Sequence, residues 1–404
     1  MITKFKNLGP GLLFAGAAIG VSHLVQSTRA GADFGLGLIW ALLLVNICKY
    51  PFFQFGPRYS TATNESLLDG YKKLGTWVLI SYYIIAFATM FTIQTAVTIV
   101  TAGLASSLFG NFISVETWSI VILTICFCLL ILGKYKLLDR LMKIIVVTLT
   151  ISTIIAVIIA YINHSGKLSL TQILPKNTID IAFLIAFMGW MPAPLDVSVW
   201  QSLWCIEKNN DTKKYTPKSA LFDFNIGYIS TIFIGIGFVL LGAYVMFHSG
   251  ETFSDSAGKF ANQLINMYTI NLGSWAYVII GIAAFTTMFS TTLTTLDASP
   301  RAMARTTELL FKKTSIFSYT FWIILLAIGT IIILLFLASG MGLLIKIATI
   351  LSFMTAPFFA IINYVLISSK HTPKEWHPSV KLHILSWLGI LFLIGFSLWY
   401  LSTL

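Results

Sequence analysis

Two short segments of the sequence combine residues that could bind a small ligand with residues that interrupt a helix. The first contains Gly20, Ser22 and His23, and the second runs from Trp190 to Asp196 and has two prolines one residue apart. A histidine offers a neutral nitrogen ligand or a proton-sensitive group. The sulfur of Met191 suits a soft transition metal or the wall of an apolar pocket. Both segments interrupt long apolar runs, so they predict a ligand site inside a membrane.

The aromatic and acidic residues of the second segment extend this chemistry. Trp190 and Trp200 flank the prolines, and an aromatic wall suits an organic ligand or a cation held against a ring face. Asp196 follows the prolines directly, and we expect it to line the site or to cap a half-helix, with structural ion pairing as the alternative. For His23 the alternative is a histidine that only bonds to its neighbours.

The composition places these segments in a membrane protein. Of the 404 residues, 57% are hydrophobic and 10% are charged, which argues against a soluble enzyme. The net charge of +11 comes from basic residues that separate apolar runs and form no groove, so we expect no nucleic-acid partner. The sequence has no H-E-x-x-H motif, Walker loop or nucleophile–base pattern. We therefore predict neither an enzyme nor a bound cofactor.

Apolar runs of about 20 residues, the length that crosses a bilayer core, recur along the whole chain. They predict an all-α polytopic membrane protein with eleven spans, at residues 11–33, 35–56, 77–108, 115–133, 138–162, 179–206, 219–247, 272–297, 318–338, 341–368 and 382–402.

The basic residues predict the orientation of these spans. With the N-terminus inside, most of the 26 Lys and Arg residues fall in cytoplasmic segments, as expected for a membrane protein. An odd number of spans then puts the C-terminus outside. We expect a monomer in a bacterial inner membrane, with membrane lipids and a small solute or ion as its partners.

The two interrupted segments occupy equivalent places, in spans 1 and 6. Paired broken helices are typical of transporters built from two inverted repeats of five helices, with the substrate held at mid-membrane. We predict a first repeat at residues 1–165, a second at 166–370 and an eleventh helix at 371–404, all within one transmembrane domain. The predicted substrate-binding residues are Gly20, Ser22, His23, Trp190, Met191, Ala193 and Asp196.

The chain resembles the NRAMP family of divalent-metal transporters in two segments, GPGLLFAGAAIGVSHLVQSTRAGADFG near its start and MPAPLDVSVWQSLW in the sixth span. The stretch after span 2, from Arg58 to Gly70, and LSFMTAPF at residues 351–358 are also similar to the family. This resemblance implies a LeuT-like fold with broken helices 1 and 6, alternating access, and the transport of metal ions.

The residues that bind metal in the family are substituted here. The family's first break carries Asp-Pro-Gly-Asn, and Gly20 to His23 stand in its place. In the sixth helix the family's Met and Pro persist as Met191 and Pro192, but Ala193 replaces a histidine. Hard divalent ions prefer oxygen ligands with negative charge, and we assign no metal-ligand set. The sequence therefore predicts an altered substrate, with a small organic or amine-bearing solute as the alternative to a metal ion.

The residues linked to proton movement are also substituted. The family's third helix carries an Asp and a Glu, which correspond to Gln94 and Val97, and the third span contains no acid. We therefore predict transport that is uncoupled from protons. If coupling persists, His23 and Asp196 are the titratable groups nearest the breaks and are predicted to carry it.

Overall fold

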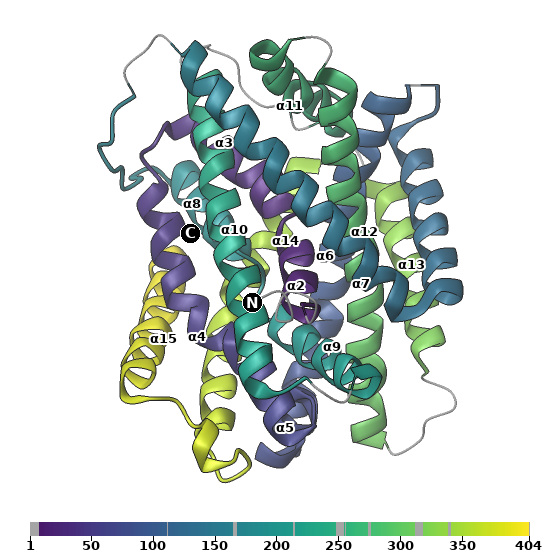
Figure 1. Ribbon diagram of the computed structural model, residues 1–404, viewed down its shortest axis with the longest axis vertical. Coiled ribbons are helices and arrows are strands. Elements are labelled where there is room, and N and C mark those ends of the chain that lie inside the picture. Colours follow the sequence, from purple (N-terminus) through teal and green to yellow (C-terminus); the bar gives the residue numbers. More distant parts are fainter. Residues whose placement is uncertain are drawn as a thin grey trace.

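The computed structural model describes residues 8–110, 112–164, 168–212, 215–247, 254, 256–273, 276–311, 318–337 and 341–403. In chain order the elements are α2 (Pro10–Ala18), η1 (Ser22–Ser27), α3 (Thr28–Phe34), α4 (Ile39–Thr63), α5 (Leu67–Leu74), α6 (Thr76–Phe109), α7 (Val115–Asn163), α8 (Thr178–Trp190), α9 (Val197–Thr212), α10 (Pro217–Val245), α11 (Ala257–Leu272), α12 (Ala276–Phe311), α13 (Tyr319–Leu337), α14 (Met341–Ile367), η2 (Lys374–Trp376) and α15 (Val380–Leu401). Figure 1 shows them as one bundle.

All eleven predicted spans coincide with helices. Eight helices of the described residues are long and apolar enough to cross a membrane, and the bent pair Pro10–Ala18 and Ser22–Phe34 makes a ninth. The sixth predicted span falls on α8 and α9 with a break between them, and the eighth falls on α12. The predicted all-α membrane fold is therefore confirmed.

Predicted spans 4 and 5 lie on a single helix, because α7 runs without interruption from Val115 to Asn163. Its two apolar parts, Val115–Leu132 and Val146–Asn163, are each long enough to cross a membrane. Figure 1 shows α7 bending sharply between a descending and a rising part. Residues 134–145 contain neither glycine nor proline, so nothing in this stretch ends the helix.

Two further helices lie outside the predicted spans. The short helix α5 begins at a capping box, in which Ser66 accepts from the backbone of Asp69 and the Asp69 carboxylate accepts from the backbone of Ser66. This reciprocal pair satisfies two N–H groups at the start of the helix. The other, α11, is an amphipathic helix of 16 residues at the opposite end of the bundle (Figure 1).

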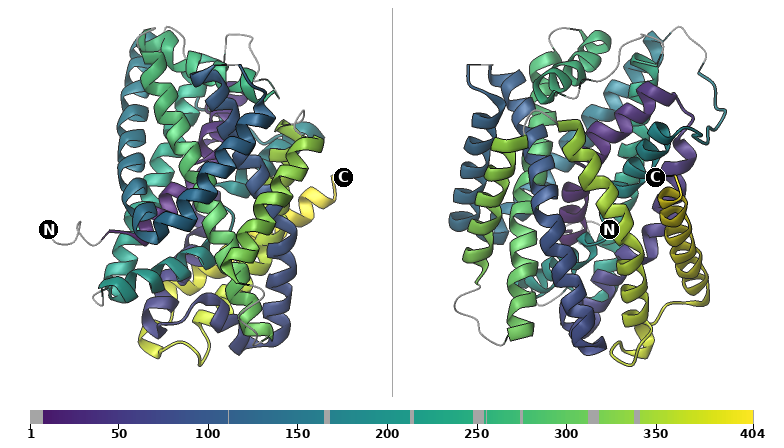
Figure 2. Two further views of the ribbon diagram at one scale, coloured as in Figure 1. Left: turned by 90° about the vertical axis from the view of Figure 1, so that its right-hand side faces the viewer. Right: turned by 180° about the vertical axis from the view of Figure 1, so that it is seen from behind.

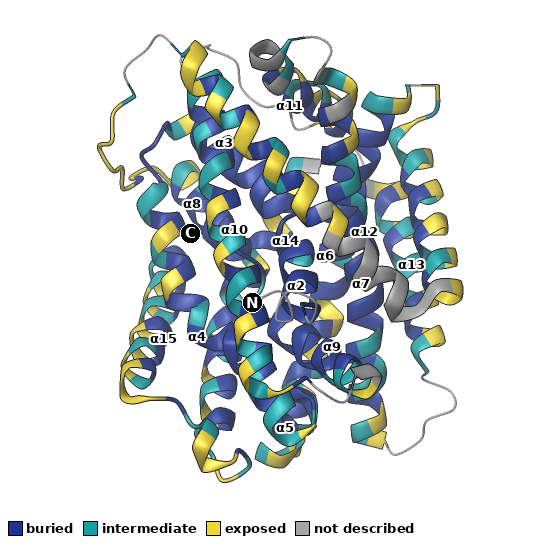
Figure 3. Ribbon diagram, in the orientation of Figure 1, coloured by how far each residue is buried: buried dark blue, intermediate teal, exposed yellow. Residues whose placement is uncertain are grey.

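The helices form an inner and an outer layer. In the apolar windows of α4 and α6, 67% of residues are buried, against 28% in α13 and 33% in α15. Helices α7, α13 and α15 carry exposed isoleucine and leucine, and α13 also carries exposed phenylalanine. Figure 3 shows the exposed residues of the bundle in yellow. An apolar belt of this kind suits lipid, and the buried inner helices are left to form a site.

Helix α10 holds both halves of the first span. A Cβ on Gly227 would lie 2.0 Å from the backbone oxygen of Gly11 in α2, and a Cβ on Gly242 would lie 2.2 Å from the backbone oxygen of Thr28 in α3. Such backbone contact requires glycine. The Asp223 carboxylate of α10 also accepts from the backbone N–H groups of Gly9 and Gly11, at 3.1 and 2.9 Å. Figure 2 shows the same bundle from two further sides.

Candidate functional site

The first span is broken as predicted. Helix α2 ends at Ala18, the chain bends by 47°, and it continues as the π-helix η1, so that Ser22 and His23 are in wide helical turns rather than unwound. Gly20 lies at the bend. A Cβ there would come within 2.7 Å of the Thr291 hydroxyl of α12, so only glycine lets α12 approach the break this closely.

The sixth span is also broken as predicted. Helix α8 ends at Trp190, residues Met191 to Asp196 are not helical, and α9 begins at Val197. Pro192 and Pro194 lack the backbone N–H that a helix interior needs, which accounts for the break. The first N–H groups of α9 find acceptors in the break itself. For example, the Val199 backbone N–H donates to the backbone oxygen of Asp196 at 2.8 Å.

A small central pocket lies between the two breaks and helices α6 and α12. Its volume of about 20 Å³ is enough for about one water molecule, so the pocket is nearly closed. None of the described residues that line it is charged. They are Ala17, Ala18, Val21, Ser22, Ile93, Val97, Trp190, Ala193, Pro194, Val197, Trp200, Thr291 and Thr295.

Three of the seven predicted substrate-binding residues line this pocket, namely Ser22, Trp190 and Ala193. The Ser22 hydroxyl donates to the backbone oxygen of Ala18 at 2.7 Å. The Trp190 indole donates to the hydroxyl of Ser352 in α14 at 2.7 Å. Gly20 borders the pocket through its contact with Thr291. The polar groups of the pocket wall are thus held in fixed positions by their neighbours.

His23 lies behind the pocket wall. Its side chain is fully buried, with Nε2 3.0 Å from the backbone oxygen of Thr231 in α10 and Nδ1 3.0 Å from the backbone oxygen of Ala18. A Cβ on Gly235 of α10 would lie 3.4 Å from the His23 ring and 3.5 Å from the Met191 sulfur. The two breaks therefore meet at Gly235, where His23 and Met191 both pack against α10.

Two charged residues are buried beside the sixth span. Asp196 is 7% exposed, and its Oδ1 has no hydrogen-bond partner among the described residues. Lys49 of α4 is fully buried, and its ammonium donates to backbone oxygens of the break in helix 6. Sequence reasoning missed Lys49 as a site residue. The one indication of this role in the sequence is that Lys49 is a basic residue inside an apolar run.

Helix α6 carries no acid toward the pocket. Gln94 is fully buried, and its amide donates to the backbone oxygen of Thr292 in α12 at 3.3 Å, while Val97 lines the pocket. This side of the site is therefore neutral in the described residues of α6.

The match with the family model for natural resistance-associated macrophage protein-like (Nramp) sequences covers residues 11–403 of this chain. The chain belongs to the Nramp family. An uncharacterized protein of Pasteurella multocida is 36% identical over 99% of this chain and 93% of its own length. The divalent metal cation transporter MntH of Staphylococcus aureus is 27% identical, over 64% of this chain and 58% of its own length.

Solved structures show that this Nramp chain has the LeuT fold. A single-residue mutant of the Eremococcus coleocola manganese transporter superposes with a TM-score of 0.75 at 12% identity, over 96% of this chain and 85% of that one. MhsT in complex with L-phenylalanine superposes with a TM-score of 0.64 at 15% identity, over 96% of this chain and 98% of that one. The predicted transporter architecture is confirmed, and a transporter rather than an enzyme follows from the family.

A second cavity of this Nramp transporter lies at the end of the bundle that carries α5. It has a volume of about 560 Å³ and is lined by Leu203 and Glu207 of α9 and by Arg301 and Arg305 of α12. These residues follow the pocket-lining residues of the same two helices by one to three turns. We call this cavity the vestibule.

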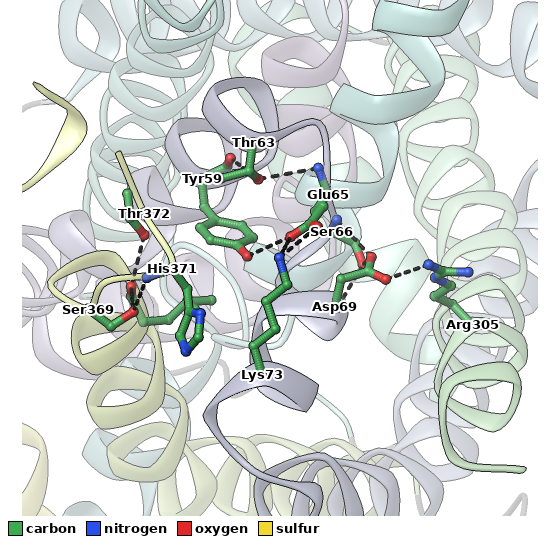
Figure 4. A network of polar contacts seen from close by, with 11 residues as sticks. Tyr59, Thr63, Glu65, Ser66, Asp69, Lys73, Arg305, Ser369, His371 and Thr372 are labelled. Atoms are coloured by element: carbon green, nitrogen blue, oxygen red, sulfur yellow. Dashed lines mark hydrogen bonds and ion pairs between the residues drawn. The ribbon is translucent and has the colours of Figure 1, made fainter. Parts of the chain in front are cut away.

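Ion pairs join the helices around the vestibule. Arg305 of α12 pairs with Asp69 of α5, and Lys73 pairs with Glu65 at 2.5 Å (Figure 4). Glu65 also accepts from the hydroxyl of Tyr59 in α4 at 3.1 Å. These contacts connect α4, α5 and α12 at one end of the bundle.

Proposed function

We propose that this Nramp-family transporter carries a small uncharged organic solute through the central pocket by alternating access. The family implies metal-ion transport, and a relative and a structural neighbour are named as metal transporters. The observation that carries the proposal is the pocket lining, which offers hydroxyls, indoles and apolar groups and no charge in the described residues. A divalent ion that enters this pocket would lose its bound water molecules, and without carboxylate ligands the pocket would not offset the free-energy cost of that dehydration.

The backbone of helix 6 supports the same proposal. Carbonyl oxygens at a helix break are the groups that could bind a metal ion or an amine in place of side chains. Here those of Met188, Gly189, Met191 and Ala193 accept hydrogen bonds from Lys49. An amine-bearing solute or a metal ion would have to compete with a tethered ammonium for these oxygens. A neutral solute has no such competitor.

The arrangement in the membrane is also part of the proposal. We propose that the end with α5 and the vestibule is cytoplasmic, with the N-terminus inside and the C-terminus outside a bacterial inner membrane, as the Lys and Arg distribution indicates. We further propose inverted repeats at residues 1–165 and 166–370, with helix 11 at 371–404, and a monomeric transporter. The predicted site consists of Gly20, Ser22, His23, Trp190, Met191, Ala193 and Asp196. Of these residues, Ser22, Trp190 and Ala193 line the pocket, and Gly20 borders it.

Purified protein is expected to be stabilised by a neutral organic solute and not by Mn²⁺. A thermal-shift screen of metal ions, amino acids and nucleobase-like compounds tests this, because a ligand that binds the folded state raises the melting temperature. Calorimetry with Mn²⁺ is expected to show no binding at micromolar concentrations. Low-micromolar Mn²⁺ binding that disappears in Met191→Ala would contradict the proposal and would place a metal at the point where His23 and Met191 meet.

We further propose that transport is uncoupled from protons, because Gln94 and Val97 supply no titratable group on α6. The lumenal pH of proteoliposomes is expected to stay constant while the solute identified by the screen accumulates. If the lumen acidifies, His23→Ala and Asp196→Asn identify the carrier, because the responsible variant takes up the solute without the pH change. Acidification that both variants retain at the wild-type ratio would contradict both the uncoupled transport and the assignment of these residues.

A further inference from the structure

The ammonium of Lys49 is enclosed by backbone oxygens of the break in helix 6. Its Nζ lies 2.7 Å from the oxygen of Gly189, 2.9 Å from that of Met188, 3.2 Å from that of Met191 and 3.4 Å from that of Ala193. An ammonium has three N–H donors, so these four oxygens share them. The oxygens thus converge on one point, as the ligands of a bound cation do.

The break itself creates this set of oxygens. The last four carbonyls of a helix have no partner within the helix, and those of Met188 and Gly189 are in this position because α8 ends at Trp190. The carbonyl end of a helix also carries a partial negative charge. Buried carbonyl oxygens without a partner cost free energy, and the Lys49 ammonium supplies the donors that satisfy them.

Asp196 is the last residue of the same non-helical segment. Its carboxylate interacts electrostatically with the Lys49 ammonium, and its Oδ1 has no hydrogen-bond partner among the described residues. A set of converging carbonyl oxygens of this kind suits a monovalent cation. Lys49 does not line the central pocket, but Ala193, whose backbone oxygen accepts from it, does.

We propose that Lys49 is a tethered cation that permanently fills a monovalent-cation site at the break in helix 6. The carbonyl oxygens would otherwise take a free ion or an organic ammonium. Because the cation is covalently attached through α4, the break forms without sodium or potassium. The proposal does not depend on which solute the transporter carries.

Chemical rescue of Lys49→Ala tests the proposal. The substitution removes the atoms of n-propylammonium and leaves the oxygens without a partner. We expect the melting temperature of the purified variant to fall by roughly 5 °C or more, and n-propylammonium chloride to restore most of this loss in a saturable manner. Choline chloride at the same ionic strength is too large for the site, and n-propanol carries no charge, so neither is expected to restore it.

Asn46→Ala is the matched control, because Asn46 is fully buried one turn earlier on α4 and its amide bonds only to the backbone oxygen of Leu42 in the same helix. Equal effects of n-propylammonium on both variants would overturn the proposal. If the Lys49→Ala protein is obtained only in unfolded form, we expect n-propylammonium, added during solubilisation, to recover monodisperse protein. If it does not, the proposal is overturned. The wild type must melt at the same temperature in sodium, potassium and choline chloride, and a higher value in one metal salt would show a free-ion site instead.

Discussion

Gly20→Leu is expected to weaken binding of the solute identified by the thermal-shift screen strongly while the bundle stays folded. A Cβ at this position would lie 2.7 Å from the hydroxyl and 2.8 Å from the methyl group of Thr291, which lines a pocket of only about 20 Å³. The larger side chain must push Thr291 into that space. The solute can enter only if Thr291 is displaced again, and if this costs about 1–3 kcal/mol, the range for overpacking, the affinity falls by about 5- to 150-fold.

The atoms in conflict belong to a side chain, so the effect can be reversed. Thr291→Ala removes both close atoms and leaves the nearest contact at 3.2 Å. Gly20→Ala is therefore expected to weaken binding on its own and to regain most of it when combined with Thr291→Ala. Binding is measured as the solute-dependent rise in melting temperature, and gel filtration checks that each variant is folded. Unchanged binding in monodisperse Gly20→Leu would show that the solute does not use this pocket.

Gly227→Leu is expected to prevent the bundle from folding. A Cβ on Gly227 would lie 2.0 Å from the backbone oxygen of Gly11, so no side chain can move aside to make room. Helix α2 would have to leave α10, with the loss of the bonds from Gly9 and Gly11 to Asp223. The expected destabilisation is about 3 kcal/mol or more, at the upper end for single substitutions.

Gly395→Leu is the matched control, because nothing lies within 4 Å of a Cβ at that exposed position of α15. It is expected to melt at or slightly above the wild-type temperature, since leucine favours a helix more than glycine does. The measurements are the monodisperse yield after detergent extraction and the melting temperature. A Gly227→Leu protein with wild-type yield and stability would contradict the close packing of α2 on α10.

The sequence by itself determines the membrane fold and the places where it is interrupted. Spans follow from the length of apolar runs, and prolines at 192 and 194 cannot be accommodated in a regular helix. The absence of acids in the third span is also visible in the sequence. These features depend on local chemistry, which is encoded residue by residue.

The tertiary structure decides which side chains of the breaks reach the pocket. A regular helix has a period that predicts its faces, but a bend or an extended segment has none. Ser22, Trp190 and Ala193 therefore line the pocket, while His23 and Met191 pack against α10.

Lys49 shows the same limit most clearly. A lysine in an apolar run can extend along the helix to the membrane surface or turn inward, and the sequence favours the first. The structure has the second, because the end of α8 presents unpaired carbonyl oxygens beside it. Those oxygens belong to Met188 and Gly189, which lie 139 and 140 residues after Lys49 in the chain. Only the packing of α4 against the break in helix 6 brings the charge and its partners together.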